Sequence, residues 1–243
     1  MSAKRAPHNV FDDSPDLPEI LYKYRCWDDR QENMYQRTLL TNNNIYFAKP
    51  SSFNDPFDSR IALRLDKARA GDKRDLLLKR IRQDYPGISS KEAIPWVRKR
   101  VLELNDPANV RKEHARQRQM IDDGFGVLPL TAARDNLVMW AHYAGSHTGF
   151  CVGIYTESLL KCGHRLFVTS HHASMIRKVN YDDDYPVVDP FGPDYVKGTW
   201  GWIAATTKSG HWKYEQEYRF ILCKPGADRS HVLPDEAFAA VFS

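Results

Sequence analysis

The stretch Trp212-Lys-Tyr-Glu-Gln-Glu-Tyr-Arg-Phe-Ile-Leu-Cys223 joins a strand signal to a pair of acidic residues. From Tyr218 onward it is rich in aromatic and β-branched residues, which is typical of a strand. Glu215 and Glu217 lie two apart at the mouth of this strand, so both carboxylates are expected on one face, with Arg219 continuing the row. Two like charges side by side are costly without a partner or a function, so this stretch is also the first candidate site.

Two interpretations of the acidic pair stay open. In the first, Arg219 or Lys213 neutralises it at a solvated strand edge. In the second, the flanking aromatic residues partly bury the pair and raise the pKa of one carboxylate, as expected of an acid, a base or a group that stabilises positive charge at a sugar carbon. Glu217 is the first choice for that role, because it lies closer to the strand interior.

Further strands are predicted on both sides of this stretch. Short aromatic or β-branched runs bounded by Gly, Pro or Asp indicate them at 20–24, 45–48, 126–131, 149–155, 176–181 and 237–242. Helices are predicted at 32–40, 72–83, 89–104, 107–121 and 195–208, the third opened by Ser89 with Glu92 nearby. The expected fold class is α+β, with a mixed or antiparallel sheet, either continuous or split, and a helical insertion.

Charge and proline distribution suggest the domain organisation. Residues 66–123 hold 15 Lys+Arg against 10 Asp+Glu, whereas the rest of the chain holds 20 against 21. The basic excess therefore comes from a helical insert within a single domain spanning 19–243. Residues 1–18 carry three prolines and few apolar positions, which predicts a flexible N-terminal arm.

Composition restricts the class of protein. The 243 residues suffice for a substantial core, and no run approaches the roughly 20 apolar residues of a membrane helix or resembles a signal-peptide core. The four cysteines are scattered without a C-x-x-C pair, which is typical of reduced thiols. We therefore expect a cytoplasmic protein without a membrane partner.

Three other stretches combine aromatic and charged residues. They are Leu21-Tyr-Lys-Tyr-Arg25, the loop region from Ile45 to Asp58, and Met139-Trp-Ala-His-Tyr143. Aromatic side chains beside Arg, His and Glu suit a pocket that stacks and orients a polar ligand.

Each stretch offers candidate ligand contacts, and each has a structural alternative. Arg25 could bind a phosphate or carboxylate bidentately while Tyr24 stacks on a ring, or it could be a surface arginine. Phe53 and Asn54 could wall a ligand site or merely stabilise a rigid loop with Asx-turns. Trp140 and Tyr143 lie three apart on a predicted helical turn, and His142 between them is either a base or a structural hydrogen-bond donor.

Several common sites are missing from the sequence. Neither Cys162-x-His164 with His171-His172 nor Asp182-Asp-Asp184 has the ligand spacing of a zinc or calcium site, so no metal is predicted. The chain also contains no G-x-S-x-G, G-x-x-x-x-G-K-[ST] or G-x-G-x-x-G motif. The sequence therefore gives no motif that would predict an ordinary hydrolase, a nucleotide triphosphatase or a Rossmann dinucleotide-binding protein.

The four motifs together resemble a bacterial family of unknown function, domain-of-unknown-function family 2971. They are L-Y-K-Y-R, I-Y-F-A-K-P-S-S-F-N-D-P-F-D, M-W-A-H-Y-A-x-S-H-T-G-F-C-V-G and W-x-Y-E-x-E-Y-R, and the resemblance extends from about Leu21 to the C-terminus. This resemblance implies domain boundaries but no reaction.

A weaker resemblance is to ADP-ribosyltransferases, including those of bacterial toxin systems. Their sites follow a similar order: a strand-end Arg or His, a central aromatic or Ser motif, and E-x-E entering a late strand. By that resemblance Arg25 would anchor the pyrophosphate of NAD, and Tyr24, Phe53 or Trp140 would stack on nicotinamide or adenine. Glu217 would stabilise the oxocarbenium ion. Glu215 would orient or deprotonate an acceptor, which is a protein, a nucleic acid or water. The chain departs from the pattern in lacking an S-T-S triplet.

The predicted function is therefore that of an NAD-dependent ADP-ribosyltransferase or NAD glycohydrolase, in a toxin or a phage-defence effector. The first alternative is a non-enzymatic binding or sensor protein of such a system, in which Glu215, Glu217 and Arg219 form a buried salt-bridge network. The second is a metal-dependent nuclease using Asp55 and Asp58 with the two glutamates, although Arg219 stands where a lysine would be expected. The acceptor and the oligomeric state are left open.

Overall fold

The computed structural model describes residues 17–27, 36–55, 57–60, 62–63, 70–103, 106–167, 174–184, 186–188, 199–223 and 229–243. Most of the predicted N-terminal arm and the first residues of the helix predicted at 32–40 lie outside these ranges. The chain divides into two compact units. Unit 1 comprises Met1–Ser59, Ile121–Asp184 and Ala205–Ser243, and unit 2 comprises Arg60–Met120 and Tyr185–Ala204.

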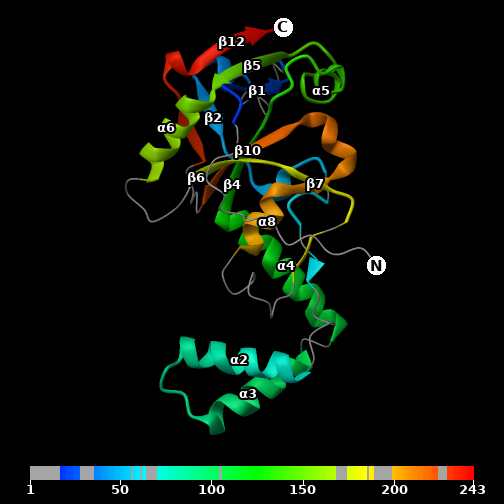
Figure 1. The fold of residues 1–243 in the computed structure, drawn as a ribbon, viewed down its shortest axis with the longest axis vertical. Coiled ribbons are helices and arrows are strands. Elements are labelled where there is room, and N and C mark those ends of the chain that lie inside the picture. The colour runs from blue at the N-terminus through cyan, green and yellow to red at the C-terminus, as the bar shows by residue number, and fades with distance from the viewer. Residues whose placement is uncertain are drawn as a thin grey trace. The chain divides into compact units, whose positions relative to one another are not determined.

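Unit 1 is built around a six-stranded sheet in the order β12-β5-β1-β4-β10-β6, and every pairing in it is antiparallel (Figure 1). The predicted α+β class is confirmed. The strands are β1 Ile20–Arg25, β4 Phe125–Thr131, β5 Phe150–Tyr155, β6 Ser174–Lys178, β10 Glu217–Cys223 and β12 Phe238–Phe242.

The strand predicted from the opening stretch, β10, lies between β4 and β6 and is buried along almost its whole length. Its residues alternate between two faces. Tyr218, Phe220 and Leu222 join the main apolar core together with Leu159 and Cys162 of the helix that follows β5. On the opposite face, Glu217 and Arg219 are buried polar residues.

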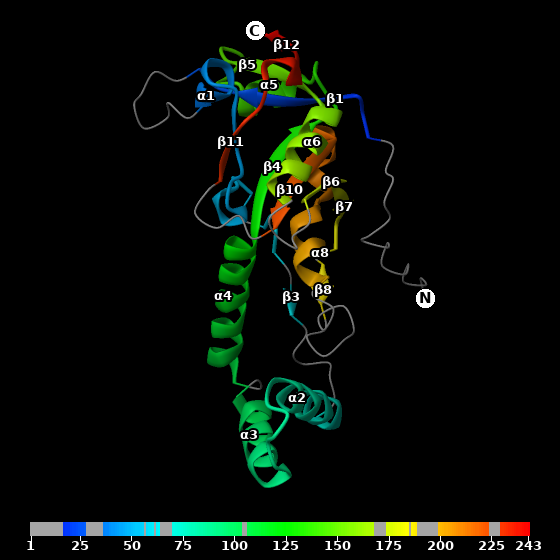
Figure 2. The ribbon, with the colours of Figure 1, turned by 90° about the vertical axis from the view of Figure 1, so that its left-hand side faces the viewer.

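The six-stranded sheet is nearly divided between β1 and β4. Strand β1 pairs with β5 along its full length, but with β4 at a single position, Tyr22 opposite Thr131. Pro129, two residues earlier on β4, has no N–H to donate to a neighbouring strand. Figure 2 shows β1 and β4 running in clearly different directions. Two three-stranded halves therefore meet at one corner and diverge from it.

Shorter elements complete unit 1. Ala48 forms an isolated bridge to Val127, so the free edge of β4 is covered by Ala48 at one end and by β1 at the other. The minor sheets pair β2 with β11 and β7 with β9. The elements are α1 Thr38–Thr41, β2 Asn44–Tyr46, η2 Pro50–Ser52, α5 Leu137–Tyr143, α6 Thr156–Phe167, β7 Asn180–Asp182, β9 Thr207–Ser209, η3 Gly210–Glu215, β11 Ser230–Val232 and η4 Asp235–Ala237.

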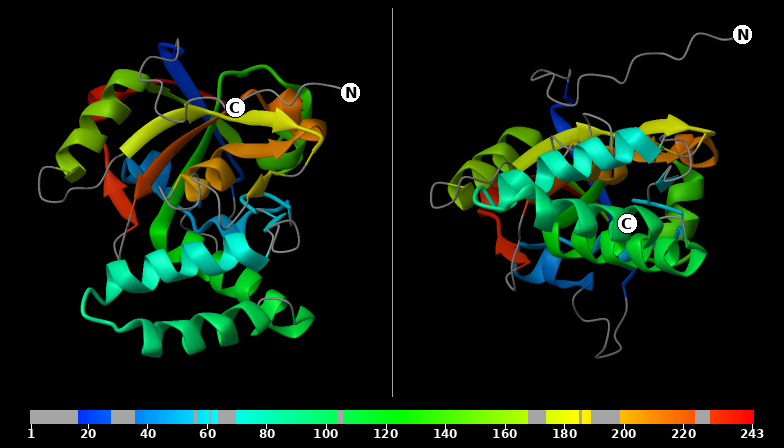
Figure 3. Two further views of the ribbon diagram at one scale, coloured as in Figure 1. Left: turned by 60° about the horizontal axis from the view of Figure 1, so that its bottom comes forward. Right: turned by 90° about the horizontal axis from the view of Figure 1, so that it is seen from below.

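Unit 2 consists mainly of helices. Helices α2 and α3 lie side by side and antiparallel (Figure 3). The predicted N-terminal cap of α3 is confirmed, since Ser89 Oγ donates to Glu92 Oε2 at 2.7 Å and accepts from the Glu92 amide at 3.3 Å. The elements are β3 Ala62–Leu63, α2 Ala70–Asp84, α3 Ser90–Glu103, α4 Pro107–Gly124, β8 Val187–Val188 and α8 Trp200–Thr206, with the last turns of α4 and α8 belonging to unit 1. In the described residues, no helix has the length and apolarity needed to cross a bilayer.

Two local predictions need correction. The helix predicted at 195–208 ends at Thr206, and Thr207 and Lys208 form part of β9, which pairs with β7. Glu215 is not a strand residue but the last residue of η3, because Gln216 adopts a left-handed conformation with φ 44° and turns the chain before β10 begins. The two glutamates therefore approach the same place from two different elements.

Candidate functional site

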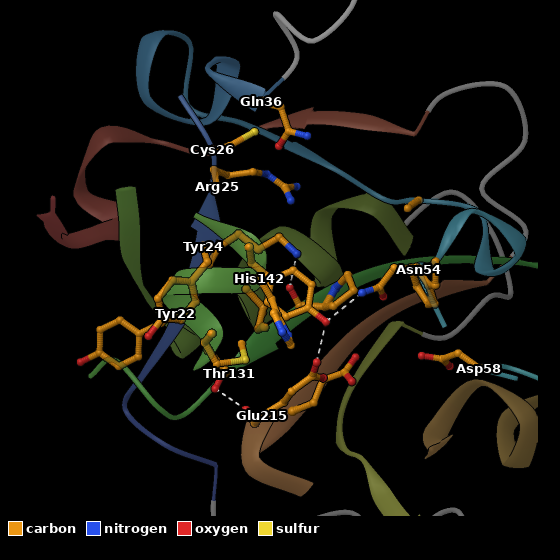
Figure 4. A pocket seen from close by; sticks show the side chains of 18 of the residues that line it. Tyr22, Tyr24, Arg25, Cys26, Gln36, Asn54, Asp58, Thr131, His142 and Glu215 are labelled. Atoms are coloured by element: carbon orange, nitrogen blue, oxygen red, sulfur yellow. Dashed lines mark hydrogen bonds between the residues drawn. The ribbon is translucent and has the colours of Figure 1, made fainter. Parts of the chain in front are cut away.

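A cavity of about 890 Å³ opens in unit 1 where β1 and β4 diverge. This volume lies in the range of small-molecule sites. Arg25, Lys23 and Cys26 line it from β1 and the residue after it, while Asp58, Lys208, Glu215 and Glu217 line it elsewhere. Figure 4 shows Arg25 and Glu215 on opposite sides of the space. One cavity thus has a cationic wall and a carboxylate-rich wall.

The structure brings most of the predicted site residues to this cavity. It is lined by Tyr24, Arg25, Phe53, Asn54, His142, Tyr143, Glu215 and Glu217. Trp140 is not among the lining residues. Its indole Nε1 donates to the carbonyl oxygen of Arg134 at 3.1 Å, and its ring packs edge-on against Tyr24 at 5.2 Å. Trp140 therefore supports the wall from behind and does not offer a stacking surface to a ligand.

Tyr24 also has a largely structural position. It is buried, and its hydroxyl donates to the carbonyl oxygen of Ala133 at 2.8 Å and to that of Arg134. These bonds attach β1 to the loop before α5. Its ring is a cavity wall, but its polar atom points into the protein.

Five ionisable side chains form a buried ion cluster at the carboxylate-rich wall. None is more than 6% exposed, and they come from the loop before β3, from β9, from η3 and from β10: Asp58, Lys208, Glu215, Glu217 and Arg219. With every group ionised, three acids and two bases leave one net negative charge. Buried charges of this kind persist only when they are paired and hydrogen-bonded.

Arg219 holds one side of the cluster together. Its Nε donates to Glu217 Oε1 at 2.7 Å, and its other nitrogens donate to Asp58 Oδ2 at 2.6 Å and to the carbonyl oxygen of Ala205 at 2.8 Å. The guanidinium carbon lies 5.4 Å from the centre of the Phe53 ring. The loop that carries Phe53 and Asp58 is therefore fixed to β10 through one fully buried arginine.

Lys208 joins the two glutamates. Its Nζ lies 2.5 Å from Glu215 Oε2 and 3.0 Å from Glu217 Oε2, with Asp58 Oδ2 at 3.8 Å. The ammonium group also lies 4.9 Å from the centre of the Trp212 ring. The positive charge of Lys208 thus offsets the repulsion between the two glutamate carboxylates, which lie close together.

Tyr143 and Thr131 fix the position of Glu215. The Tyr143 hydroxyl donates to Glu215 Oε1 at 2.5 Å and accepts from Asn54 Nδ2 at 3.3 Å. Thr131 Oγ1 donates to the carbonyl oxygen of Glu215 at 2.5 Å. Glu217 is held by its backbone, whose N–H donates to the Tyr181 hydroxyl at 2.8 Å.

The surroundings separate the acidities of the two glutamates. Burial alone would raise the pKa of Glu217, but Arg219 and Lys208 outweigh burial and lower that pKa to about 2. For Glu215, burial prevails over Lys208 and, with the charge of Glu217 acting in the same direction, raises the pKa. Burial also acts against the charge of Lys208, yet Glu217, Glu215 and Asp58 outweigh it and raise the lysine pKa. The cluster thus contains one carboxylate that its cations hold ionised and one carboxyl group that takes up a proton more readily.

His142 lies on the exposed side of the cavity. Its Nδ1 is 3.1 Å from the Tyr214 hydroxyl, and its ring packs edge-on against Tyr143 and Trp212. The start of its helix is fixed because Asn136 Oδ1 accepts from the amides of Val138 and Met139 while Asn136 Nδ2 donates to the Tyr214 carbonyl oxygen. His142 is therefore positioned to meet a ligand but not tied to the ion cluster.

A tight turn after α5 places Arg25. Gly145, Ser146 and His147 all have positive φ, and Gly149 follows two residues later. A side chain at Gly149 would put its Cβ only 2.2 Å from the Arg25 carbonyl oxygen. Glycine is therefore required for the turn to lie directly against the end of β1.

Three cavity residues were not singled out for their roles from the sequence. Lys208 lies outside the four motifs in a three-residue strand, and an ion pair of Asp58 with Arg219 was not predicted. Lys23 lies inside the L-Y-K-Y-R motif, in which Tyr24 and Arg25, not Lys23, were predicted to contact a ligand. Spacing alone gave no signal for Lys208, because its contacts depend on the β7–β9 pairing.

The geometry also bears on the nuclease alternative. In the described part of the chain, no three His, Cys, Asp or Glu side chains are arranged to hold a metal ion. At the cluster itself, Lys208 and Arg219 occupy the spaces next to the carboxylate oxygens. The oxygens of these carboxylates are therefore already paired with side-chain cations.

Comparison with known proteins finds a family resemblance over part of the chain and no function. Residues 139–220 match the model of a family described as protein of unknown function (DUF2971). The match confirms the resemblance to that family over α5, β5, α6, β10 and the segments between them. It includes the M-W-A-H-Y and W-x-Y-E-x-E-Y-R motifs, whereas L-Y-K-Y-R and the Phe53 loop lie before it. No curated protein and no solved structure matches the chain.

Proposed function

We propose that the cavity binds NAD or a closely related nucleotide and promotes cleavage of its nicotinamide–ribose bond. The observation that carries this proposal is the convergence of Arg25 and the Glu215–Glu217 pair, distant in sequence, on one cavity of ligand size. Arg25 suits a pyrophosphate, since a guanidinium binds such oxygens in pairs. The aromatic rings of Phe53 and Tyr143 in the same cavity suit a base.

The ion cluster supports a division of roles between the glutamates. Breaking an N-glycosidic bond builds positive charge on the ribose, and a preorganised anion stabilises that charge. Glu217 stays ionised because Arg219 and Lys208 hold its charge, and the cluster has one net negative charge to offer. Glu215, whose pKa burial raises, is the group that accepts a proton from the attacking water or acceptor hydroxyl.

The acceptor is water, a protein side chain or a nucleic-acid base. Transfer to water makes the protein an NAD glycohydrolase, and transfer to a macromolecule makes it an ADP-ribosyltransferase. The biological setting that we propose, from the resemblance to toxin enzymes, is a bacterial toxin or a phage-defence effector acting on the cytoplasmic NAD pool.

One observation favours a second candidate, a nucleotide-binding sensor without turnover. Both oxygens of Glu217 already bind Arg219 or Lys208, and Glu217 is only 3% exposed. In this alternative the ion cluster fixes the wall of a binding site, and the ligand is recognised without reaction.

The two candidates differ in nicotinamide release. We expect the purified protein to bind NAD in calorimetric titrations and to release nicotinamide, as measured by chromatography. Glu215→Gln is expected to lower turnover at least about tenfold while NAD still binds, because the amide keeps the size of the side chain but cannot accept a proton. Arg25→Met is expected to weaken NAD binding about tenfold or more, because the charge-assisted contacts to phosphate are lost.

Lys161→Gln on α6 is the control, because this exposed lysine lies away from the cavity. Thermal unfolding of every variant separates lost function from lost structure. NAD binding without nicotinamide release would favour the sensor. Absence of both binding and release in the folded wild-type protein would eliminate NAD as the ligand.

A further inference from the structure

Lys23 is a cavity residue that the proposed cleavage does not use. It lies on β1 between Tyr22 and Tyr24 and is partly buried. Its Nζ donates to the carbonyl oxygen of Pro129 at 2.6 Å, across the opening between β1 and β4. The amine therefore lies at the wall of the cavity, where the strands separate.

The surroundings of Lys23 differ from those of Lys208. Among the residues that the structure describes, no carboxylate lies within ion-pair distance of Lys23 Nζ, whereas Lys208 meets three. Arg25 follows Lys23 by two positions on the same strand, so both side chains extend from the same face, and both line the cavity. One lysine is thus neutralised by acids, and the other is placed beside a second cation.

These surroundings favour the neutral amine. Burial, then the charge of Arg25 and, more weakly, that of Lys208 lower the pKa of Lys23 well below its usual value. Glu217 and Glu215 act in the opposite direction but do not compensate. A lysine of lowered pKa in a cavity next to another cation is a recognised arrangement for nucleophilic amines.

We infer that Lys23 forms an imine with an aldehyde or ketone bound in the cavity, and that this compound carries an anionic group that binds Arg25. The neutral amine attacks the carbonyl carbon, a C–N bond forms, and the carbonyl oxygen takes up a proton to give a carbinolamine. Loss of water then leaves the protonated imine, so no oxidant or reductant is required. The carbonyl compound is either a free phosphorylated aldehyde or the open-chain form of a ribose that carries phosphates.

This inference does not depend on NAD cleavage, because the amine reacts with a carbonyl group whether or not the cavity breaks a glycosidic bond. Both proposals use Arg25 to bind an anionic group, but the imine forms at Lys23, whereas the proposed cleavage takes place at the ion cluster. Pro129 contributes by accepting one hydrogen bond from Lys23 without providing a negative charge that would hold the amine in its protonated form.

The test uses the full-length protein and pyridoxal 5′-phosphate as the probe, at neutral pH and low molar excess. Borohydride reduces each imine to a stable secondary amine, and peptide mass spectrometry locates the labelled lysines. We expect labelling of Lys23 at least about tenfold faster than of the exposed Lys161, since each unit of pKa lowering increases the neutral fraction about tenfold. Lys208 serves as the matched cavity control and is expected to remain unlabelled, because its amine is held protonated by carboxylates.

Lys23→Arg keeps a positive side chain able to donate to Pro129 but cannot form an imine, so it should abolish the rapid labelling while leaving that of Lys161 unchanged. Inorganic phosphate should slow labelling of Lys23 only, by competing at Arg25. ADP-ribose serves as a second probe, and its trapping at Lys23 would identify a phosphorylated ribose as the carbonyl source. Trapping with pyridoxal phosphate alone would assign the site to other phosphorylated aldehydes.

Labelling of Lys23 no faster than that of Lys161, or rapid labelling that persists in Lys23→Arg, would overturn the inference. Nicotinamide release is measured separately on the unlabelled protein. If imine trapping succeeds and NAD is not cleaved, the proposed function is rejected and the reactive amine stands. If NAD is cleaved and no imine is trapped, the inference about Lys23 is rejected and the proposed function stands.

Discussion

The hydroxyl of Tyr143 is the group through which α5 and the Asn54 loop meet the ion cluster. It donates to Glu215 Oε1 at 2.5 Å and accepts from Asn54. Tyr143→Phe removes both bonds without changing the ring. Because a hydrogen bond to a carboxylate favours the ionised form, we expect the pKa of Glu215 to rise further and the free energy of unfolding to fall by about 1–2 kcal/mol.

A carbon-detected NMR titration of the glutamate carboxyls and denaturant unfolding measure the two effects. Tyr155→Phe on β5 is the matched control, because Tyr155 is 37% exposed and lies outside the cavity. An unchanged Glu215 titration in Tyr143→Phe would show that this hydrogen bond is not formed in solution.

Residue patterns predicted which types of side chain form the site better than they predicted the contacts between those side chains. The E-x-E spacing placed Glu215 and Glu217 together, and the aromatic density pointed to a cavity that the structure contains. The sequence could not reveal that both carboxylates contact Lys208, because that contact requires β7 to pair with β9. Nor did it show the left-handed Gln216, since a residue of this type adopts positive φ only under tertiary constraint.

Among the elements, the turn from Gly145 to Gly149 is the most sensitive support of the cavity. A Cβ at Gly149 would lie 2.2 Å from the Arg25 carbonyl oxygen and 2.9 Å from the Ala144 carbonyl group. These are backbone atoms, so they cannot move aside as a flexible side chain would. We expect Gly149→Ala to lower the free energy of unfolding by about 2 kcal/mol or more and to displace the end of β1.

Gly87→Ala in unit 2 is the control, because its added Cβ would meet nothing within 4 Å. Chemical or thermal unfolding compares the two variants, and NAD titration of Gly149→Ala tests whether Arg25 has moved. Equal stability of both variants would mean that the turn does not contact β1 as closely as the structure shows.

Elements were predicted well where their signals are local. The aromatic and β-branched runs of β4, β5 and β10 and the Ser89–Glu92 cap each depend on neighbouring residues, and each appears in the structure. The helix predicted at 195–208 was too long at its C-terminal end, because Thr207 and Lys208 pair with β7. Thr207 lies opposite Asn180, which is 27 residues earlier in the sequence, so local patterns could not indicate this pairing. The order of strands in the sheet depends on contacts between residues far apart in sequence, so local patterns do not predict it. The divergence of β1 and β4, which creates the cavity, could therefore not be predicted.

At the scale of the whole molecule, the buried ion cluster makes stability depend on pH. The pKa of Glu217 is lowered from 4.5 to about 2 on folding, so its contribution is complete above pH 4.5 and is lost as the pH falls toward 2. This difference corresponds to about 3 kcal/mol. Lys208 has a raised pKa, so its contribution is complete below pH 10.5 and is lost at higher pH. Glu215, with its raised pKa, acts in the opposite direction to Glu217, because its contribution is lost as the pH rises above 4.5.

We therefore expect the free energy of unfolding to fall steeply between pH 4.5 and pH 2, and Glu217→Gln to reduce this slope. The variant should also be less stable than the wild type at pH 6 by about 3 kcal/mol or more, because Arg219 and Lys208 lose a buried counter-charge. Guanidinium unfolding at several pH values measures both effects, with Glu19→Gln, at an exposed position, as the control. Glu217→Gln could instead be less stable at pH 6 and still show the same fall in the free energy of unfolding between pH 4.5 and pH 2 as the wild type. Other carboxylates would then cause the pH dependence. The ion cluster would then stabilise the fold through packing and hydrogen bonds more than through the charge of Glu217.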